Sequence, residues 1–345
     1  MDALDRLVAP YRATGADLPF GRPERAHGVA MEGYFWRITT PERSAIALIG
    51  VNRGPRGPWA TLGVATSPGD GQPAGLATAA VEGAWADPDA LGAGSGEAFL
   101  GTDRTLRVRL PQAELDATFT DLLRWPQRPF GGSSVFQVVP ALNQYWHPWL
   151  LGGRASGAVT LDGDRWEFAD AQVYGEKNWG RGGFPDAWWW GQAHGFAEGG
   201  ACVAFAGGQV YAGPLRTEVT GLVVRLPDGT VIRLGNPGTS PVTARVHDEA
   251  WTLRGRSRTW SVDVDAHAPL GDAHVLPVPL PTEHRNTPGA LEQLSGTLAV
   301  TVRRRGRIVW RGTSTMAGLE HGGLARAEAE LARRGGDPHP IRRQD

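Results

Sequence analysis

The sequence has almost no cysteine, with the single Cys202 in 345 residues. A lone thiol can form neither a disulfide within the chain nor a cysteine-based metal site. Cys202 lies in the apolar, alternating run GGACVAFAGG, which favours a buried structural thiol over a nucleophile. The nine histidines lack the short spacings typical of metal ligands. We therefore expect no metal site.

Several other features are missing, and each excludes a class of protein. No apolar run is long enough to span a bilayer, and the N-terminal stretch MDALDRLVAPYRATG is too charged for a secretion signal, so we expect a cytoplasmic protein. Lys and Arg number 35 against 36 Asp and Glu, which excludes the positive surplus that nucleic acid binding requires. No glycine-rich loop joins a strand to a helix, and no Gly-x-Ser-x-Gly elbow is present.

Glycine and tryptophan, in contrast, are abundant, with 48 and 14 residues. Glycine permits the positive φ of tight turns, and tryptophan fills wide apolar space. Alternation of apolar and polar residues dominates the chain, and it turns at Asp162-Gly163, at Asp228-Gly229, near Arg305-Gly306 and at 198–200. These signals predict β-hairpins and an all-β, antiparallel fold of barrels or sandwiches.

The chain divides most naturally near residue 140, where a Gly-, Pro- and Ser-rich segment interrupts the alternation. We expect an N-terminal half at 1–140 and a C-terminal half at 141–345, each with about the strands of an eight-stranded barrel. Residues 1–14 and the tail LARAEAELARRGG have helical composition, so we expect short helices at the ends.

The stretch YGEKNWGRGGFPDAWWWGQ, residues 174–192, surrounds the adjacent pair Glu176 and Lys177 with aromatic side chains. Glu176 is either a structural carboxylate paired with Lys177 or turn amides, or an acid kept protonated by its apolar surroundings. The two side chains face opposite sides if the segment is a strand. Trp188 and Trp190 then share one face, as core packing or as a cage whose rings stabilise a cation.

Three motifs, in order along residues 27–323, resemble the tocopherol cyclase family, which is similar to lipocalin-like proteins that include carotenoid hydratases. The first is HGVAMEGYFWRIT and the last is STMAGLEHGG. The central one runs from GAVTLDGDRWEFADAQVYGEKNWG through Phe184-Pro185 to Gln192. The chain departs from the pattern by one extra residue between His27 and Glu32 and one after Trp179, and it matches poorly over 55–110.

The resemblance implies two lipocalin-like β-barrel halves in tandem and an enzyme that closes a prenylated hydroquinone to a chromanol without a cofactor. That reaction requires a proton donor, a dry pocket, aromatic faces towards a cation and polar groups for the quinol. Glu176 is the candidate acid and Glu32 the second. The candidate substrate-binding residues share aromatic or amide character or a place in the motifs: His27, Asn178, Trp179, Phe184, Trp188, Trp190 and Gln192.

Two other functions remain open. A hydratase would capture the same cation with water, and a lipocalin-like carrier would bind a lipid or pigment without chemistry. A wetter pocket favours the first, and a cavity without an acid favours the second. In each case the partner is a hydrophobic small molecule. A long-tailed substrate would have to be collected from lipid, which is consistent with peripheral membrane contact without an anchor.

Overall fold

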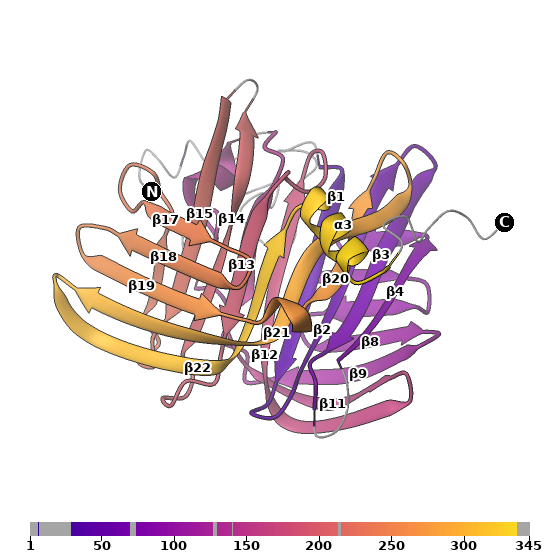
Figure 1. Cartoon of the computed structure of the whole chain (residues 1–345), viewed down its shortest axis with the longest axis horizontal. Helices are drawn as coiled ribbons and strands as arrows, with labels where there is room; N and C mark the ends of the chain where they lie inside the picture. Colours follow the sequence, from indigo (N-terminus) through magenta and orange to yellow (C-terminus); the bar gives the residue numbers. More distant parts are fainter. Residues whose placement is uncertain are drawn as a thin grey trace.

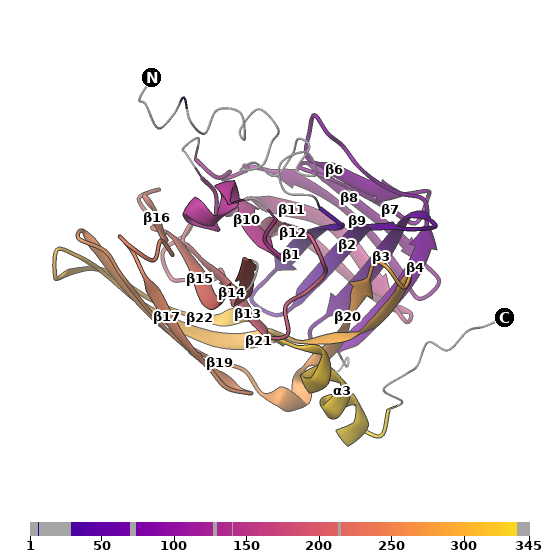
Figure 2. The same cartoon turned by 90° about the horizontal axis from the view of Figure 1, so that it is seen from above.

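The structure, a computed structural model, describes Arg6 and residues 29–69, 74–126, 130–139, 141–212 and 215–336. These residues form two antiparallel sheets of twelve and ten strands. Figures 1 and 2 show the two curved sheets side by side. The predicted all-β, antiparallel, lipocalin-like fold is therefore confirmed. The predicted helix at 1–14 lies outside the described residues, apart from the helical Arg6.

The first sheet has the strand order β4-β3-β2-β1-β12-β11-β9-β8-β7-β6-β5, with β10 paired to β12. Its strands are β1 (Met31–Thr39), β2 (Ser44–Gly54), β3 (Gly57–Thr66), β4 (Gly75–Glu82), β5 (Ala84–Ala86), β6 (Gly92–Ser95), β7 (Phe99–Thr102), β8 (Thr105–Leu110), β9 (Ala113–Thr120), β10 (Tyr145–Leu150), β11 (Arg154–Leu161) and β12 (Asp164–Gly180). The short 3-10 helix η1 (Ser134–Val138) precedes β10.

The second sheet has the order β16-β15-β14-β13-β22-β21-β19-β18-β17, with β20 paired to β21. Its strands are β13 (Trp188–Ala193), β14 (Cys202–Ala212), β15 (Leu215–Arg225), β16 (Val231–Leu234), β17 (Val242–Val246), β18 (Ala250–Arg256), β19 (Trp260–His267), β20 (His274–Leu280), β21 (Arg285–Arg304) and β22 (Arg307–Gly322). The 3-10 helix η2 (Leu270–Asp272) precedes β20, and the helix α3 (Leu324–Arg333) follows β22 as the sequence predicts.

The predicted hairpins are present. Asp162 and Gly163 join β11 to β12 with φ of 50° and 84°, and Arg305 and Gly306 join β21 to β22 with 50° and 82°. Two consecutive residues at positive φ are typical of the turn whose twist matches that of paired strands. Asp228 and Gly229 join β15 to β16, and the segment that contains 198–200 joins β13 to β14.

The chain passes from the first sheet to the second at residues 181–187, and not near residue 140. β10, β11 and β12 follow the Gly- and Pro-rich segment, yet they pair within the first sheet. The Gly- and Pro-rich segment near residue 140 is therefore a connection within the first sheet, because the strand that follows it, β10, pairs with β12 of that sheet. Turn-forming composition marks a connection but does not tell which sheet the chain enters next.

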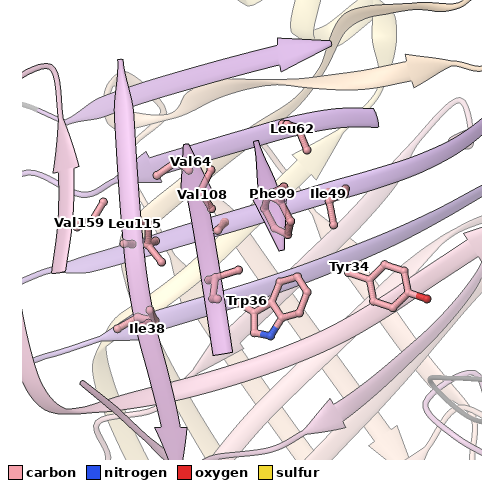
Figure 3. Packing of buried hydrophobic residues seen from close by; sticks show 14 of the residues in the cluster. Tyr34, Trp36, Ile38, Ile49, Leu62, Val64, Phe99, Val108, Leu115 and Val159 are labelled. Carbon is pink, nitrogen blue, oxygen red and sulfur yellow. The ribbon is translucent and has the colours of Figure 1, made fainter. Parts of the chain in front are cut away.

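Each sheet surrounds an apolar core of its own. In the first, Trp36, Phe99 and Val108 belong to a buried cluster that draws on most strands of the sheet, and Figure 3 shows its side chains gathered together. In the second, Phe205, Trp251 and other apolar side chains form a separate cluster. Complete burial of one such side chain stabilises the fold by roughly 1.5–3 kcal/mol.

Smaller clusters contain residues of both sheets. One contains Ile46 of β2 and Trp188 of β13, and another contains Tyr174 of β12 and Trp190 of β13. The outer faces of β12 and β13 thus meet between the sheets. No helix in the described part of the chain is both long and apolar enough to cross a membrane.

Candidate functional site

A cavity lies between the two sheets. Strands β1, β2, β3, β10 and β12 of the first sheet and β13, β14, β15, β20, β21 and β22 of the second contribute to its wall. Most of the lining is apolar, with aromatic side chains that include Phe35, Trp146, Trp188 and Trp190. Aromatic walls with a few polar groups are typical of sites for apolar ligands.

One transverse row of residues forms the wall on the side of the second sheet. Glu292 of β21 lies opposite Glu320 of β22, and Glu320 lies opposite Trp190 of β13. Trp190 in turn lies opposite Ala206, and Ala206 opposite Gly221. Directly opposed residues of antiparallel strands share a face of the sheet. All five residues line the cavity.

Glu176 of β12 faces this row from the first sheet, and all of its hydrogen bonds end on one oxygen. Its Oε2 accepts from the Tyr174 hydroxyl at 2.6 Å, from Trp190 Nε1 at 2.7 Å and from Trp146 Nε1 at 2.8 Å. The side chain lines the cavity and is 7% exposed. Because Oε2 already accepts three donors, Oε1 is the oxygen that carries the proton of the neutral acid and is available to a ligand.

Burial raises the pKa of the Glu176 carboxyl, whereas the hydrogen bonds from Tyr174, Trp146 and Trp190 lower it. The net shift is upward, because desolvation disfavours the carboxylate more than the three donors stabilise it. Glu176 forms no ion pair within the described residues. The arrangement therefore favours a neutral acid whose conjugate base would meet donors that are already in place.

Four predicted binding residues line the same cavity as Glu176, namely Asn178, Phe184, Trp188 and Trp190. Trp188 lines the cavity, donates from Nε1 to Glu320, and packs on Phe184 with ring centroids 4.8 Å apart. Asn178 lines the cavity on the same face of β12 as Glu176. Its buried Oδ1 accepts no hydrogen bond from the residues that the structure describes, so it could accept one from a ligand.

Trp179 and Gln192 do not line the cavity. Trp179 is fully buried and stacks on Tyr145, with centroids 5.5 Å apart. Gln192 is also fully buried, and its Oε1 accepts from Arg37 Nη1 at 2.8 Å. The alternation of β12 places Trp179 on the face opposite Glu176. In the structure, the Trp179 ring packs in the protein interior, and the Gln192 amide holds the Arg37 guanidinium.

Glu32 does not line the cavity and is held in a buried ion pair. Its Oε2 is 2.7 Å from Lys177 Nζ, its Oε1 contacts Arg53, and the Tyr34 hydroxyl donates to Oε2 at 3.2 Å. Burial alone would raise the pKa of Glu32, but Lys177 and Arg53 outweigh it and lower the pKa to about 2. Glu32 is a carboxylate at neutral pH, which does not suit a proton donor. His27 lies outside the described residues.

The cavity residues that the sequence reasoning missed include Glu292 and Trp146. Glu292 stands in the apolar run GALEQLSG, where a lone acid at a buried position is the signal that could have found it. Trp146 stands in NQYWHPW within the segment interpreted as a junction. Among the described residues, no group of three or more His, Cys, Asp or Glu is arranged to hold a metal ion.

Comparison with known families and sequences gives one consistent result. The family model described as tocopherol cyclase-like matches residues 125–323. A probable chloroplastic tocopherol cyclase of Oryza sativa subsp. japonica is 29% identical over 207 residues, and a chloroplastic tocopherol cyclase of Zea mays is 30% identical over 195. Each match covers 53% of this chain and 40% of the relative. The chain thus spans less than half the length of these curated relatives.

Solved structures resemble the whole fold at low identity. Kievitone hydratase from Nectria haematococca is 14% identical with a TM-score of 0.52, and the comparison covers 88% of this chain and 92% of that one. CghA is 12% identical with a TM-score of 0.52 and covers 86% and 88%. At such identity these neighbours share the fold alone. The family match covers β10 to β22, and with them Glu176 and the row that faces it.

Proposed function

The chain belongs to the tocopherol cyclase-like family, and from this membership and the cavity we propose that it closes a prenylated, phytyl-type hydroquinone to a chromanol. The reaction adds a proton to the trisubstituted alkene and joins the phenol oxygen to the resulting tertiary cation. It is a redox-neutral isomerisation and needs no cofactor. The single observation that carries the proposal is the desolvated Glu176, which lies in an aromatic cavity and has no cationic partner among the described residues.

Glu176 supplies the proton. Its neutral form is favoured by burial, and Oε1 is the oxygen free to reach an alkene carbon. After transfer, the carboxylate is stabilised by Tyr174, Trp146 and Trp190, whose donors need no rearrangement. An acid at this position contributes ~100-fold or more to the rate.

The aromatic lining supports the cation. Rings of Trp190 and Phe35 meet edge to face with centroids 5.2 Å apart, and Trp188 extends the same wall. A desolvated cation over a well-placed ring gains ~1–2 kcal/mol. Asn178 supplies a hydrogen-bond acceptor for a quinol hydroxyl, since no group in the described part of the chain donates to its Oδ1.

Hydration of an isoprenoid alkene is the second candidate. It uses the same protonation, and water captures the cation in place of the phenol oxygen. Polar side chains of Ser133, Gln144 and Gln209 also line the cavity and could hold a water molecule. The product separates the two reactions, because a hydratase gives a tertiary alcohol and leaves the quinol open.

Incubation of the purified protein with a phytyl hydroquinone in deuterium oxide, without oxygen, tests the proposal. We expect a chromanol with one deuterium on the carbon next to the new quaternary centre, formed with a single configuration at that centre. Protein-free acid cyclisation gives both epimers at that centre and serves as the control. A substrate that binds tightly and returns unchanged would instead support a carrier.

A further inference from the structure

Glu292 and Glu320 form a second acidic group in the same cavity. They are directly opposed on β21 and β22, and both line the cavity wall. Glu292 is fully buried, and among the described residues its oxygens meet no hydrogen-bond donor other than the carboxyl of Glu320 when one of the two groups is protonated. Glu320 accepts a hydrogen bond from Trp188 Nε1. Neither carboxyl has a cation within ion-pair distance in the described part of the chain.

Two carboxylates so placed cannot both be ionised, because like charges in a desolvated site repel strongly. Burial, and then the neighbouring Glu320, raises the pKa of Glu292 well above its usual value. Burial likewise raises the pKa of Glu320 to about 7, and the charge of Glu176 adds to the shift. The two carboxyls therefore titrate as a pair.

The groups that face the pair come from four other strands. Glu176 of β12 adds negative charge when it is ionised, and the positive charge of Arg37 of β1 lowers the pKa of Glu292. Arg37 is already bound to Gln192 and to the carbonyls of Leu294 and Met316. Trp188 of β13 donates to Glu320. His274 of β20, opposite Glu292, bonds through its ring to the Thr66 carbonyl.

We propose that Glu292 and Glu320 share one proton and act as the base of the cavity, accepting the proton that the substrate's hydroxyl group loses as the cation is captured. This inference rests on the proposed function. Trp190 lies between the two acidic groups, since it is the cross-strand neighbour of Glu320 and donates to Glu176. A ligand against this row meets the donor Glu176 on one side and the acceptor pair on the other.

The proton balance is complete. Glu176 loses a proton as a C–H bond forms at the alkene, and the substrate's O–H bond breaks as the C–O bond forms. The pair gains that proton, so that after one turnover Glu176 is a carboxylate and the pair holds one proton more. Transfer of a proton from the pair to Glu176, through water or directly, restores the starting state without any other reactant.

The shared proton can be tested without turnover. In protein labelled with 13C at the glutamate carboxyls, we expect a carboxyl that titrates near pH 7 and disappears in Glu320→Gln. Glu292→Gln should lower the pH at which Glu320 titrates, because it removes the neighbouring negative charge. If both carboxyls titrate near the usual value for glutamate in the folded protein, no shared proton exists and the proposal is overturned. Glu114→Gln, at an exposed position of β9, is the matched control.

The role as base is tested by comparing two products in deuterium oxide. In Glu320→Gln we expect chromanol formation to fall ~100-fold. Deuterium should still enter the alkene of recovered substrate at a rate within about 3-fold of wild-type cyclisation, because Glu176 still forms the cation and capture has become slow.

Three other results would contradict either the role of the pair as base or the proposed function. Unchanged cyclisation in both Glu320→Gln and Glu292→Gln would mean that Glu176 takes back the proton itself, and the base role is then wrong. Loss of deuterium exchange together with cyclisation would mean that the pair serves the protonation step, which also overturns it. If wild-type protein converts no prenylated quinol, the proposed function fails, while the titration still decides whether the pair shares a proton.

Discussion

Glu176 and Lys177 are adjacent in the chain, yet their charged groups lie on opposite faces of β12. The Glu176 carboxyl accepts three hydrogen bonds at the cavity between the sheets. The Lys177 ammonium lies 2.7 Å from Glu32 and over the rings of Tyr34 and Trp179. Strand alternation enforces this separation. The Glu176 carboxyl therefore forms no ion pair with the Lys177 ammonium that neighbours it in the sequence.

The Glu32–Lys177 ion pair should be structural. Glu32→Gln leaves the buried ammonium of Lys177 without its carboxylate, so we expect the free energy of unfolding to fall by ~3–5 kcal/mol. Chemical denaturation followed by circular dichroism measures this. In the variant Glu32→Leu/Lys177→Met both charges are absent, and its loss should be clearly smaller. Equal losses for the single and double variants would contradict the assignment.

Glu176→Gln should abolish most turnover while the fold persists. Glutamine keeps the shape and can still accept the hydrogen bonds of Trp146, Trp190 and Tyr174, but it has no proton of comparable acidity. We expect kcat for chromanol formation to fall ~100-fold or more. Glu32→Gln, measured at a temperature where it is folded, should retain near wild-type kcat. Full activity of Glu176→Gln would assign the proton to another group.

Replacement of Trp190 and of Trp179 should distinguish a tryptophan of the cavity wall from one that only packs in the protein interior. Trp190→Phe removes the donor to Glu176 and replaces the indole in the cavity wall with a smaller ring, and we expect kcat to fall about 10-fold, equivalent to ~1.4 kcal/mol. Trp179→Phe changes a fully buried ring on the other face, so it should lower stability by ~1–3 kcal/mol and kcat by less than about 3-fold. The reverse pattern would place Trp179 at the substrate.

Stability should fall as pH rises towards neutral. The pKa of Glu320 is raised to about 7 in the folded protein, so the folded state binds its proton more tightly than the unfolded chain does. The resulting stabilisation is complete below about pH 4.5 and is lost as pH rises through about 7. Glu320→Gln should flatten this decline in thermal melting temperature between pH 5 and 8.

Glu32 changes the stability of the fold in the opposite direction, and it does so at lower pH. Its pKa is lowered to about 2, so its contribution is present above about pH 4.5 and is lost as pH falls towards 2. The melting temperature should therefore decline on both sides of a weakly acidic optimum. Only the neutral limb should respond to Glu320→Gln, and only the acidic limb to Glu32→Gln. A wild-type melting temperature independent of pH from 5 to 8 would speak against the raised pKa of Glu320.

Local chemistry determined much of this fold. Turn residues at Asp162-Gly163 and Asp228-Gly229 predict hairpins because few residues accept positive φ. Period two placed Trp188 and Trp190 on one face of a strand and Trp189 on the other, as in the structure, where Trp189 belongs to the second core. The helix α3 follows from the composition of its segment and the glycines that end it.

Tertiary structure alone decided where the cavity lies. Alternation separates the two faces of β12 but does not tell which face the second sheet covers, so Asn178 and Trp179 were equivalent candidates. The pairing of Glu292 with Glu320 depends on the register of β21 against β22, which passes several irregularities along two long strands. A shift of one residue would turn either carboxyl to the opposite face. Register over such lengths is set by the packing of both sheets, which no local pattern contains.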